Sequence, residues 1–256
     1  MIEYLAKLPI LKRLIPSIGI RILRLFKKNR GYFKIGKINF YLDFMDPMDR
    51  QIIIHKKYED DQVLFFENQM DQTSFDYFLD IGSNSGYYSF YFAAKYKNLK
   101  VKAFEPNLEP FNKFQKTLYK NSFKNIEVFN FGLSDQEKKV RMRSMITHNY
   151  IHSNSIVTEN FNKLYNKNLK FSEATLKVGD NLFNFSEKKL ALKIDVEGHE
   201  IYTLKGLIKN LLKNKCLIMI EISDEKFSEV NEFLIKNSFK KIFKSKYRTD
   251  YVYTNF

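Results

Sequence analysis

Two acidic residues and a turn of small residues indicate where the chemistry of this chain lies. Asp80 comes near the end of an apolar run, and the segment 82–86 that follows reads Gly-Ser-Asn-Ser-Gly. Glu105 closes a second apolar run one strand and one helix later. In α/β proteins, ligands bind outside the carboxyl ends of parallel strands. We therefore expect Asp80 and Glu105 to face one ligand from the same edge of a sheet.

The spacing of the small residues distinguishes between cofactors. A dinucleotide site uses G-x-G-x-x-G so that the backbone can approach a pyrophosphate at a helix N-terminus. Here Asn84 stands at the middle position, and no third glycine follows Gly86. A carboxylate and an amide suit a ligand with an amino-acid ammonium and no phosphate. S-adenosylmethionine therefore fits better than a nicotinamide dinucleotide, and the alternative is a turn of structural value only.

The expected cofactor contacts follow from this placement. Asp80 would lie near the amino-acid portion, and Glu105 would accept hydrogen bonds from both ribose hydroxyls. Small residues after a third strand would let the adenine ring lie against backbone. The residues predicted in this way are Asp80, Gly82, Ser83, Asn84, Gly86, Glu105, Gly132, Leu133, Ser134 and Asp135.

A second group of ionisable residues follows a later apolar run. Residues 195–200 read Asp-Val-Glu-Gly-His-Glu and lead directly into a helical pattern. Glu200 is expected to interact with the positive end of that helix. For Asp195, Glu197 and His199, the position at a strand end favours a role in the reaction.

Hydrophobic periodicity predicts the elements that must position these groups. The predicted strands are 77–81, 100–104, 126–131, 190–194 and 216–222, and the predicted helices are 86–96, capped by Ser85, 108–121, 201–211 and 224–237. Two more strands, 239–244 and 250–254, form a closing β-hairpin. The fold class is α/β: a mostly parallel, Rossmann-like sheet that ends in an antiparallel β-hairpin, with helices on both faces.

Three segments lie outside this alternation. Residues 31–44 predict a small β-hairpin around Gly36, and the segment 41–74 is interpreted as an accessory or lid layer over the cofactor. Residues 137–143 predict an outward-facing hairpin strand. The Asn- and Ser-rich segment 145–171 shows no clear period, so we interpret it as a long loop and assign it to acceptor binding.

Composition and charge set limits on the class of protein. The 256 residues can form one α/β domain with an extension, and the single cysteine, Cys216, argues against a disulfide scaffold or a cysteine metal site. Residues 1–40 hold ten Lys or Arg and one acid, which is +9 of the net charge of +14. We therefore divide the chain into a basic arm (1–40), the accessory layer (41–74) and the main domain (75–256).

The arm has an apolar stripe and a basic face between residues 11 and 26. Charges recur too often for a membrane-spanning segment, and no cleavage site of a signal peptide follows. We expect residues 1–30 to contact an anionic membrane surface, which places the protein in the cytoplasm, peripheral on the inner membrane face. The alternative is a helix packed on its own domain. A nucleic-acid partner is not expected, because the positive charge is concentrated in the arm.

Taken together, three segments resemble the FkbM family of S-adenosylmethionine-dependent methyltransferases. They are Phe-Leu-Asp-Ile-Gly-Ser-Asn-Ser-Gly-Tyr-Tyr at 78–88, Ala-Phe-Glu-Pro-Asn at 103–107 and Leu-Lys-Ile-Asp-Val-Glu-Gly-His-Glu at 192–200. The resemblance covers roughly residues 40–256 and adds Pro106 and Asn107 to the cofactor residues. Tyr58-Glu59 resembles the acid pair ahead of the family's lid helix.

The resemblance implies a class I methyltransferase fold and, most often, O-methylation of a sugar hydroxyl in a glycan, a glycolipid or a secondary metabolite. Such a transfer needs a base for the hydroxyl proton. An imidazole has an unperturbed pKa of about 6.5, which suits this task at neutral pH. We expect His199 to be the base, oriented by a neighbouring carboxylate, and Asp195 to position the hydroxyl. The alternative is a divalent metal held by Asp195 and Glu197.

Two other functions remain open from the sequence. One is a methyltransferase that acts on RNA or protein, which would place basic residues along the cofactor cleft as well as in the arm. The other is a catalytically silent, membrane-associated binding module of the same fold, which would not bind S-adenosylmethionine.

Overall fold

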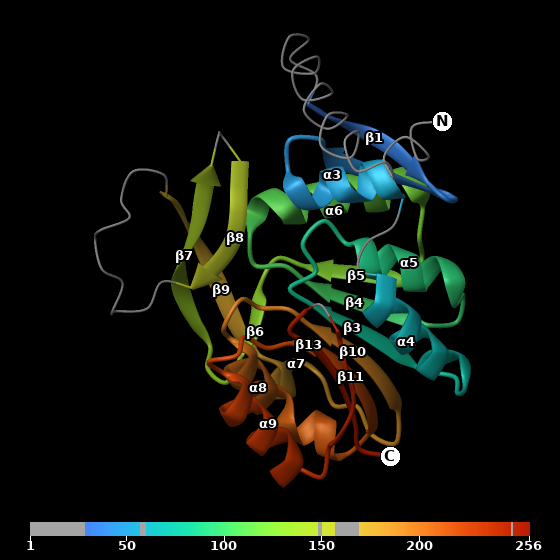
Figure 1. Ribbon diagram of the computed structural model, residues 1–256, viewed down its shortest axis with the longest axis vertical. Helices are drawn as coiled ribbons and strands as arrows, with labels where there is room; N and C mark the ends of the chain where they lie inside the picture. The colour runs from blue at the N-terminus through green and yellow to red at the C-terminus, as the bar shows by residue number, and fades with distance from the viewer. Residues whose placement is uncertain (1–28, 57–59, 148–149, 157–168, 247) are drawn as a thin grey trace.

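A seven-stranded sheet lies at the centre of the computed structural model, which describes residues 29–56, 60–147, 150–156, 169–246 and 248–256 (Figure 1). Its strands are β3 (Tyr77–Ile81), β4 (Lys100–Phe104), β5 (Ile126–Phe129), β10 (Lys189–Ile194), β11 (Lys215–Glu221), β12 (Lys240–Lys244) and β13 (Asp250–Thr254). The order is β12-β13-β11-β10-β3-β4-β5. β3, β4, β5, β10 and β11 are parallel, whereas β12 and β13 are antiparallel. The predicted fold class, including the closing hairpin, is confirmed.

Helices cover both faces of this sheet because the strand residues alternate between two cores. Phe78 packs in the core beneath α4 (Asp60–Asp71), α5 (Tyr87–Lys95) and α6 (Leu108–Asn121), and Leu79 packs in the opposite core with α8 (Glu200–Leu212) and α9 (Phe227–Lys236). The short helix α7 (Gly179–Leu182) contacts α8. Cys216 is fully buried in the second core.

A second, four-stranded sheet flanks the first and departs from the prediction. Its order is β6-β9-β7-β8, and its strands are β6 (Gly132–Ser134), β7 (Lys138–Thr147), β8 (Tyr150–Ile156) and β9 (Leu169–Val178). The predicted strand 126–131 is too long, because β5 ends at Phe129 and the chain resumes as β6 in this other sheet. The predicted loop 145–171 is wrong where it overlaps β7, β8 and β9. The Ser-Asn-Ser run of β8 concealed a strand, and β7 holds β8 and β9 by antiparallel backbone pairing on its two sides.

An accessory layer lies over α6 at the top of Figure 1. It consists of the hairpin β1 (Arg30–Ile35) and β2 (Ile38–Asp43) and the helix α3 (Pro47–His55), so it begins before the predicted segment 41–74 and does not include α4. The side chains of Thr117 and Asn121 on α6 bond the backbone of Tyr41 and Asn39, so α6 pairs with the outer edge of β2. The predicted hairpin around Gly36 is confirmed, and the predicted division at residue 40 falls inside β2.

Two predicted features lie outside the described residues: most of the basic arm, residues 1–28, and the pair Tyr58-Glu59. None of the helices that the structure describes is long and apolar enough to cross a membrane.

Candidate active site

A cavity of about 1010 Å³ opens at the carboxyl edge of the parallel strands. Four groups of residues form its walls: the turn after β3 with the end of β4, the segment after β10, the accessory layer with α6, and the second sheet. From the turn and β4 come Gly82, Ser83, Asn84, Glu105, Pro106 and Asn107, and from the segment after β10 come Asp195, Val196, Glu197 and His199. The structure therefore brings both predicted clusters to one cavity.

The turn 82–86 is fixed by close approach of backbone. Gly82 has a φ of +80°, and a Cβ placed on it would stand 1.8 Å from the carbonyl oxygen of Asp195. The backbone N–H groups of Gly82 and Ser83 both donate to the carbonyl of Phe104. Only glycine fits at position 82, because a side chain would collide with the neighbouring strand end.

Ser85 does not cap α5, which corrects the prediction. Gly86, with a φ of 88°, is the N-cap residue and makes no capping bond of its own. In the first turn, the backbone N–H of Ser89 donates to the Asp80 carboxylate. The fully buried hydroxyl of Ser85 instead donates to Asp49 Oδ1 at 3.1 Å.

Glu105 directly follows β4, with one carboxylate oxygen bonded to the turn after β3 and the other to its own chain two residues on. Oε2 accepts a hydrogen bond from the backbone N–H of Asn84, and Oε1 accepts one from Asn107, each at 2.8 Å. Burial raises the pKa of Glu105 to about 7, even though the two N–H donors favour the ionised form. Each oxygen keeps a lone pair for a further donor from the cavity, as the predicted contact with two ribose hydroxyls requires.

Two buried polar atoms of the cavity wall have no partner in the described part of the chain. They are the hydroxyl of Ser83 and the Nδ2 amide of Asn107. Buried polar groups are nearly always hydrogen-bonded, so unpaired ones in a cavity wall indicate a bound ligand. Ser83 directly precedes Asn84, and Asn84 and Asn107 are the two backbone partners of Glu105. Together with Gly82, the two unpaired atoms suit the polar ends of S-adenosylmethionine.

Asp80 lies behind the cavity wall and does not line it. Its carboxylate is buried, and Oδ2 accepts hydrogen bonds from the Ser89 hydroxyl at 2.6 Å and the Ser89 backbone N–H at 3.1 Å. Burial raises the pKa of Asp80, while the nearby Lys193 ammonium opposes this. Oδ1 has no partner in the described residues. Its predicted contact with the amino-acid portion of the cofactor stays a prediction.

Of the other predicted cofactor residues, some line the cavity and some do not. Gly132 and Leu133 line the cavity, whereas Gly86, Ser134 and Asp135 do not. Ser134 is fully buried where β6 meets α8. These assignments stay predictions.

Asp195 follows β10 and projects into the cavity beside Lys193. The Lys193 ammonium donates to Asp195 Oδ2 at 2.8 Å and lies 4.9 Å from the centre of the Tyr88 ring. Lys193 lines the cavity although only 5% of it is exposed. Sequence reasoning missed this residue, since a lysine within a buried strand was counted as part of the apolar run.

Glu197 adopts a left-handed backbone conformation with a φ of 50°, which is strained for a residue with a side chain. Its side chain is exposed at the mouth of the cavity, but the surrounding walls remove enough water from the carboxylate to raise its pKa to about 7. The negative charges of Asp195 and Glu221 add to this effect. Because the side chain is exposed, solvent screens part of it.

His199 is the N-cap residue of α8 and lines the cavity. Its Nε2 lies 2.9 Å from the Ser134 hydroxyl, and its ring stacks on Tyr202 with the centres 4.8 Å apart. Partial burial, together with the positive charge of Lys138, lowers its pKa to about 4. His199 is therefore neutral at pH 7. A serine, not a carboxylate, holds its ring, although the Ser134 hydroxyl also lies 3.2 Å from Asp135 Oδ1.

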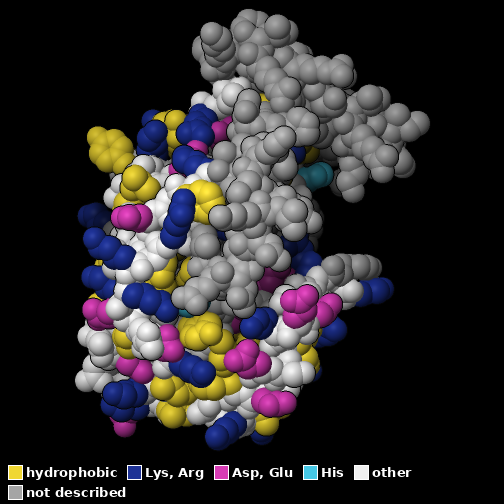
Figure 2. Space-filling view, turned by 90° about the vertical axis from the view of Figure 1, so that its left-hand side faces the viewer, with side chains coloured by type: hydrophobic (Ala, Val, Ile, Leu, Met, Phe, Trp, Pro, Cys, Tyr) yellow, Lys and Arg dark blue, Asp and Glu magenta, His cyan; other side chains and the backbone are white. Residues whose placement is uncertain are grey.

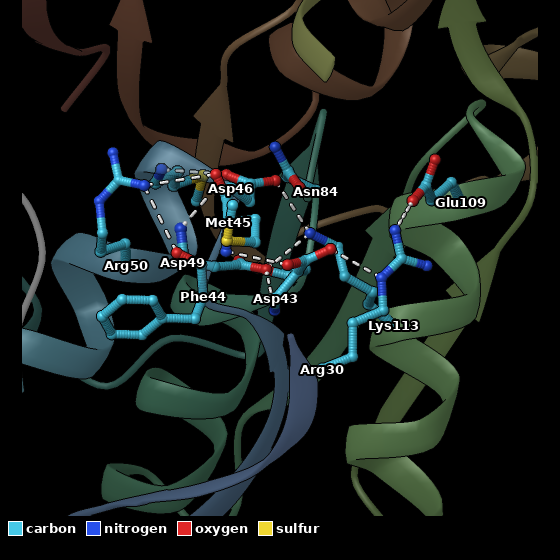
Figure 3. A network of polar contacts seen from close by, with 12 residues as sticks. Arg30, Asp43, Phe44, Met45, Asp46, Asp49, Arg50, Asn84, Glu109 and Lys113 are labelled. Atoms are coloured by element: carbon cyan, nitrogen blue, oxygen red, sulfur yellow. Dashed lines mark hydrogen bonds and ion pairs between the residues drawn. The ribbon is translucent and has the colours of Figure 1, made fainter. Parts of the chain in front are cut away.

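A polar network of the accessory layer forms the opposite wall, and sequence reasoning missed it (Figure 3). The buried Lys113 of α6 pairs with Asp49 at 2.7 Å and with Asp46 at 3.1 Å. Arg30 pairs with both Asp43 and Glu109. Of these residues, Arg30, Asp43, Asp46, Glu109 and Lys113 line the cavity. No motif marks them, because they come from three segments that are distant in sequence.

The described residues contain no group of three or more His, Cys, Asp or Glu that could hold a metal ion. The sequence alternative of a metal at Asp195 and Glu197 therefore has two carboxylates and no third ligand from the described part of the chain.

The fold and cavity define an α/β protein that binds its ligand at the carboxyl ends of parallel strands. The chain matches the family model of the methyltransferase FkbM domain over residues 80–245. This range is more than half of the chain, so the protein belongs to the FkbM family and is an S-adenosylmethionine-dependent methyltransferase. The resemblance noted in the sequence is confirmed, and no curated protein matches the chain in sequence.

Solved structures with a similar arrangement are distant in sequence. An rRNA methylase from Streptococcus thermophilus has 13% identity and a TM-score of 0.45, with 77% of this chain and 96% of that chain covered. The human methyltransferase 10 domain containing protein has 11% identity and a TM-score of 0.48, with 94% and 95% covered. M. jannaschii TYW2 in complex with AdoMet has 15% identity and a TM-score of 0.43, with 88% and 84% covered. At these values, the neighbours do not indicate what this chain methylates.

Proposed function

We propose that this methyltransferase transfers the methyl group of S-adenosylmethionine to a hydroxyl of a sugar in a glycan, a glycolipid or a secondary metabolite. The observation that carries the proposal is the balance of charge in the cavity. Among the residues that the structure describes, seven acidic and six basic residues line it. The acidic residues are Asp43, Asp46, Glu105, Glu109, Asp195, Glu197 and Glu221, and the basic residues are Arg30, Lys113, Lys116, Lys170, Lys193 and Arg248.

This balance favours a neutral, hydroxyl-bearing acceptor over RNA. A nucleic-acid site needs unpaired Lys and Arg along the phosphate path, whereas Arg30, Lys113 and Lys193 are paired with carboxylates. On the face shown in Figure 2, basic side chains are interspersed with acidic ones over the described surface. Carboxylates and amides at the cavity wall, such as Asp195, Glu197 and Asn112, are groups that bind sugar hydroxyls.

The cofactor supplies a methyl group already activated by a sulfonium, so the protein must align the acceptor oxygen and remove its proton. In the proposed arrangement Ser83, Asn107 and Glu105 bind the cofactor. Asp195, held by Lys193, orients the acceptor hydroxyl. His199 is neutral and is the proposed base. Burial lowers its pKa to about 4, so it is a weaker base than the unperturbed imidazole expected from the sequence. Its Nε2 is engaged with the Ser134 hydroxyl, which leaves Nδ1 to accept the proton.

Two experiments test this function, first a binding measurement and then an activity screen. Calorimetry with S-adenosylmethionine comes first, and a silent binding module would show no heat of binding. A glycan acceptor screen follows, with mass detection of a gain of about 14 daltons, the mass difference of one CH₂ group. Methylation of RNA or protein with no methylation of any glycan would overturn the acceptor assignment.

The proton step is tested on the acceptor that the screen identifies. Turnover of His199→Ala and Asp195→Asn is measured with and without a chelator. If His199 is the base, His199→Ala loses about 10²-fold to 10⁴-fold in kcat. An active His199→Ala enzyme excludes the base assignment. Chelator-sensitive wild-type activity would instead favour a metal at Asp195 and Glu197.

We also propose that the basic arm attaches the protein to an anionic membrane surface. The arm has nine of the fourteen net positive charges. Each basic residue near an anionic leaflet contributes about 1 kcal/mol, and the apolar stripe adds to this. A variant lacking residues 1–28 should no longer sediment with anionic liposomes at low salt. Sedimentation equal to that of the full chain would contradict the proposal.

A further inference from the structure

One buried carboxylate, Asp49, joins the accessory layer to the turn that binds the cofactor. Its Oδ1 accepts a hydrogen bond from the Ser85 hydroxyl at 3.1 Å. Its Oδ2 accepts one from the Lys113 ammonium at 2.7 Å and another from the backbone N–H of Asp43 at 2.9 Å (Figure 3). The side chain is fully buried. A single group on α3 therefore holds together β2, α6 and the turn after β3.

The partners of Asp49 lie on two sides of the cavity. Lys113 lines the cavity and also bonds Asp46, another lining residue, at 3.1 Å. Ser85 is fully buried and follows Ser83 and Asn84 in the turn, and these two residues line the cavity. Asp49 is thus placed between the wall available to an acceptor and the turn that contacts the cofactor.

Stability alone does not explain this carboxylate. Burial raises the pKa of Asp49 to about 6, even though Lys113 favours the ionised form. Its ionisation at neutral pH is therefore harder in the folded protein than in the unfolded chain. Buried ion pairs can often be replaced by apolar residues without loss of stability. The specific geometry, with one oxygen reserved for Ser85, is what an apolar replacement could not reproduce.

We propose that Asp49 is a positioning residue, which holds the cofactor turn through Ser85 and couples it to the cavity wall formed by Asp46 and Lys113. Ordering of this wall then favours the binding geometry of the turn, and cofactor binding favours the ordered wall. The coupling is reciprocal, as any linkage between two sites must be. The proposal requires that the turn 82–86 binds the cofactor, and it holds for any acceptor.

The test measures the affinity of the full chain for S-adenosylmethionine by calorimetry. Ser85→Ala removes only the hydroxyl, and Asp49→Asn weakens the link from the other side. Each should lower the affinity about 2-fold to 10-fold, the equivalent of one hydrogen bond. Because both substitutions break the same hydrogen bond, the double variant should bind the cofactor no more weakly than the single variant of lower affinity.

A matched control separates this role from general support of the accessory layer. Asn121→Ala removes the side-chain bonds from α6 to the backbone of Asn39, at 2.8 and 2.9 Å, without touching Ser85 or Asp49. It should lower the melting temperature and leave the affinity unchanged.

Three results would overturn the proposal: wild-type affinity in Ser85→Ala, an equal loss of affinity in Asn121→Ala, or losses that multiply in the double variant. Ser85→Ala and Asn121→Ala decide the matter even if Asp49→Asn does not fold.

Discussion

At the cofactor edge, backbone groups of neighbouring strand ends fix the turn 82–86, whereas in the accessory layer charged side chains make the decisive contacts. Gly82 and Ser83 donate to the Phe104 carbonyl from adjacent strand ends. By contrast, the pair of Lys113 with Asp49 spans 64 positions of sequence, and the pair of Arg30 with Glu109 spans 79. The first kind of contact requires particular small residues at fixed spacing. The second requires only opposite charges that meet in space.

The largest expected effect tests the backbone contact at the cofactor edge. Gly82→Ala should lower the free energy of unfolding by about 4 kcal/mol, because the new Cβ meets the Asp195 carbonyl and the φ of +80° is strained. Urea unfolding measures the loss.

Gly36→Ala is the matched control for this substitution, since Gly36 has a φ of +58° in the accessory hairpin and open space around its Cβ. It should cost only the backbone strain, about 1–2 kcal/mol. Equal losses in the two variants would show that close approach does not distinguish the two regions.

The second effect tests the ion pairs of the accessory layer. Lys113→Met leaves Asp49 and Asp46 without their shared cation and should destabilise the fold by about 3 kcal/mol. The pKa of Asp49 is already raised by burial, and without Lys113 it rises further. A raised carboxyl pKa means that stability is lost as pH rises from the unfolded value toward the folded one. The deficit should therefore be larger at pH 8 than at pH 5.

Lys116→Met, one helical turn later, is the control for this loss. Lys116 is exposed, and its ammonium lies 4.3 Å from the centre of the Tyr41 ring. Removing it should cost less than about 1 kcal/mol. Destabilisation as large as that of Lys113→Met would mean that burial of the ion pair is not what matters.

The same contrast explains how far the sequence could be interpreted. The bounds predicted for β3, β4 and α6 match the structure, because each is a periodic run that ends at turn or cap residues. Strand β8 was missed, since its Ser-Asn-Ser run at 153–155 lacks apolar alternation and its pairing comes from a neighbour. Strand β9 was missed although Ala174, Leu176 and Val178 alternate. Local spacing alone led us to expect Glu105 and Asp195 at the cavity, and both line it, whereas Asp80 lies behind the wall. The Asp49 network could not be placed, because nothing local relates α3 to α6.

The third effect concerns cofactor affinity. Glu105→Ala should weaken S-adenosylmethionine binding by about 1.5–3 kcal/mol, the range for hydrogen bonds to a charged group. Because a factor of ten corresponds to about 1.4 kcal/mol, calorimetry should show a loss of roughly 10-fold to 150-fold. Wild-type affinity in this variant would remove the ribose assignment. It would also leave Glu105 as a residue that only orders the backbone of Asn84 and Asn107.

The smallest expected effect is the pH dependence of that affinity. Burial raises the pKa of Glu105 to about 7 in the free protein. The ionised carboxylate is the form that accepts hydrogen bonds from ribose hydroxyls, so affinity should fall as the pH drops from 8 to 6. One unit below the pKa, about a tenth of the molecules remain ionised, which gives a loss of nearly tenfold.

Stability should change in the opposite direction, which makes the assignment testable. A carboxyl group whose folded pKa is raised contributes most to stability below its unfolded pKa, and this contribution is lost as pH rises from about 4.5 to about 7. Lowering the pH should therefore stabilise the free protein at this group while it weakens cofactor binding. Glu105→Gln should flatten both profiles, whereas Glu197→Gln, at a carboxylate whose pKa is also about 7, should leave the affinity profile intact. An affinity profile that Glu105→Gln does not change would assign the titration to another group and break the link between burial of Glu105 and cofactor binding.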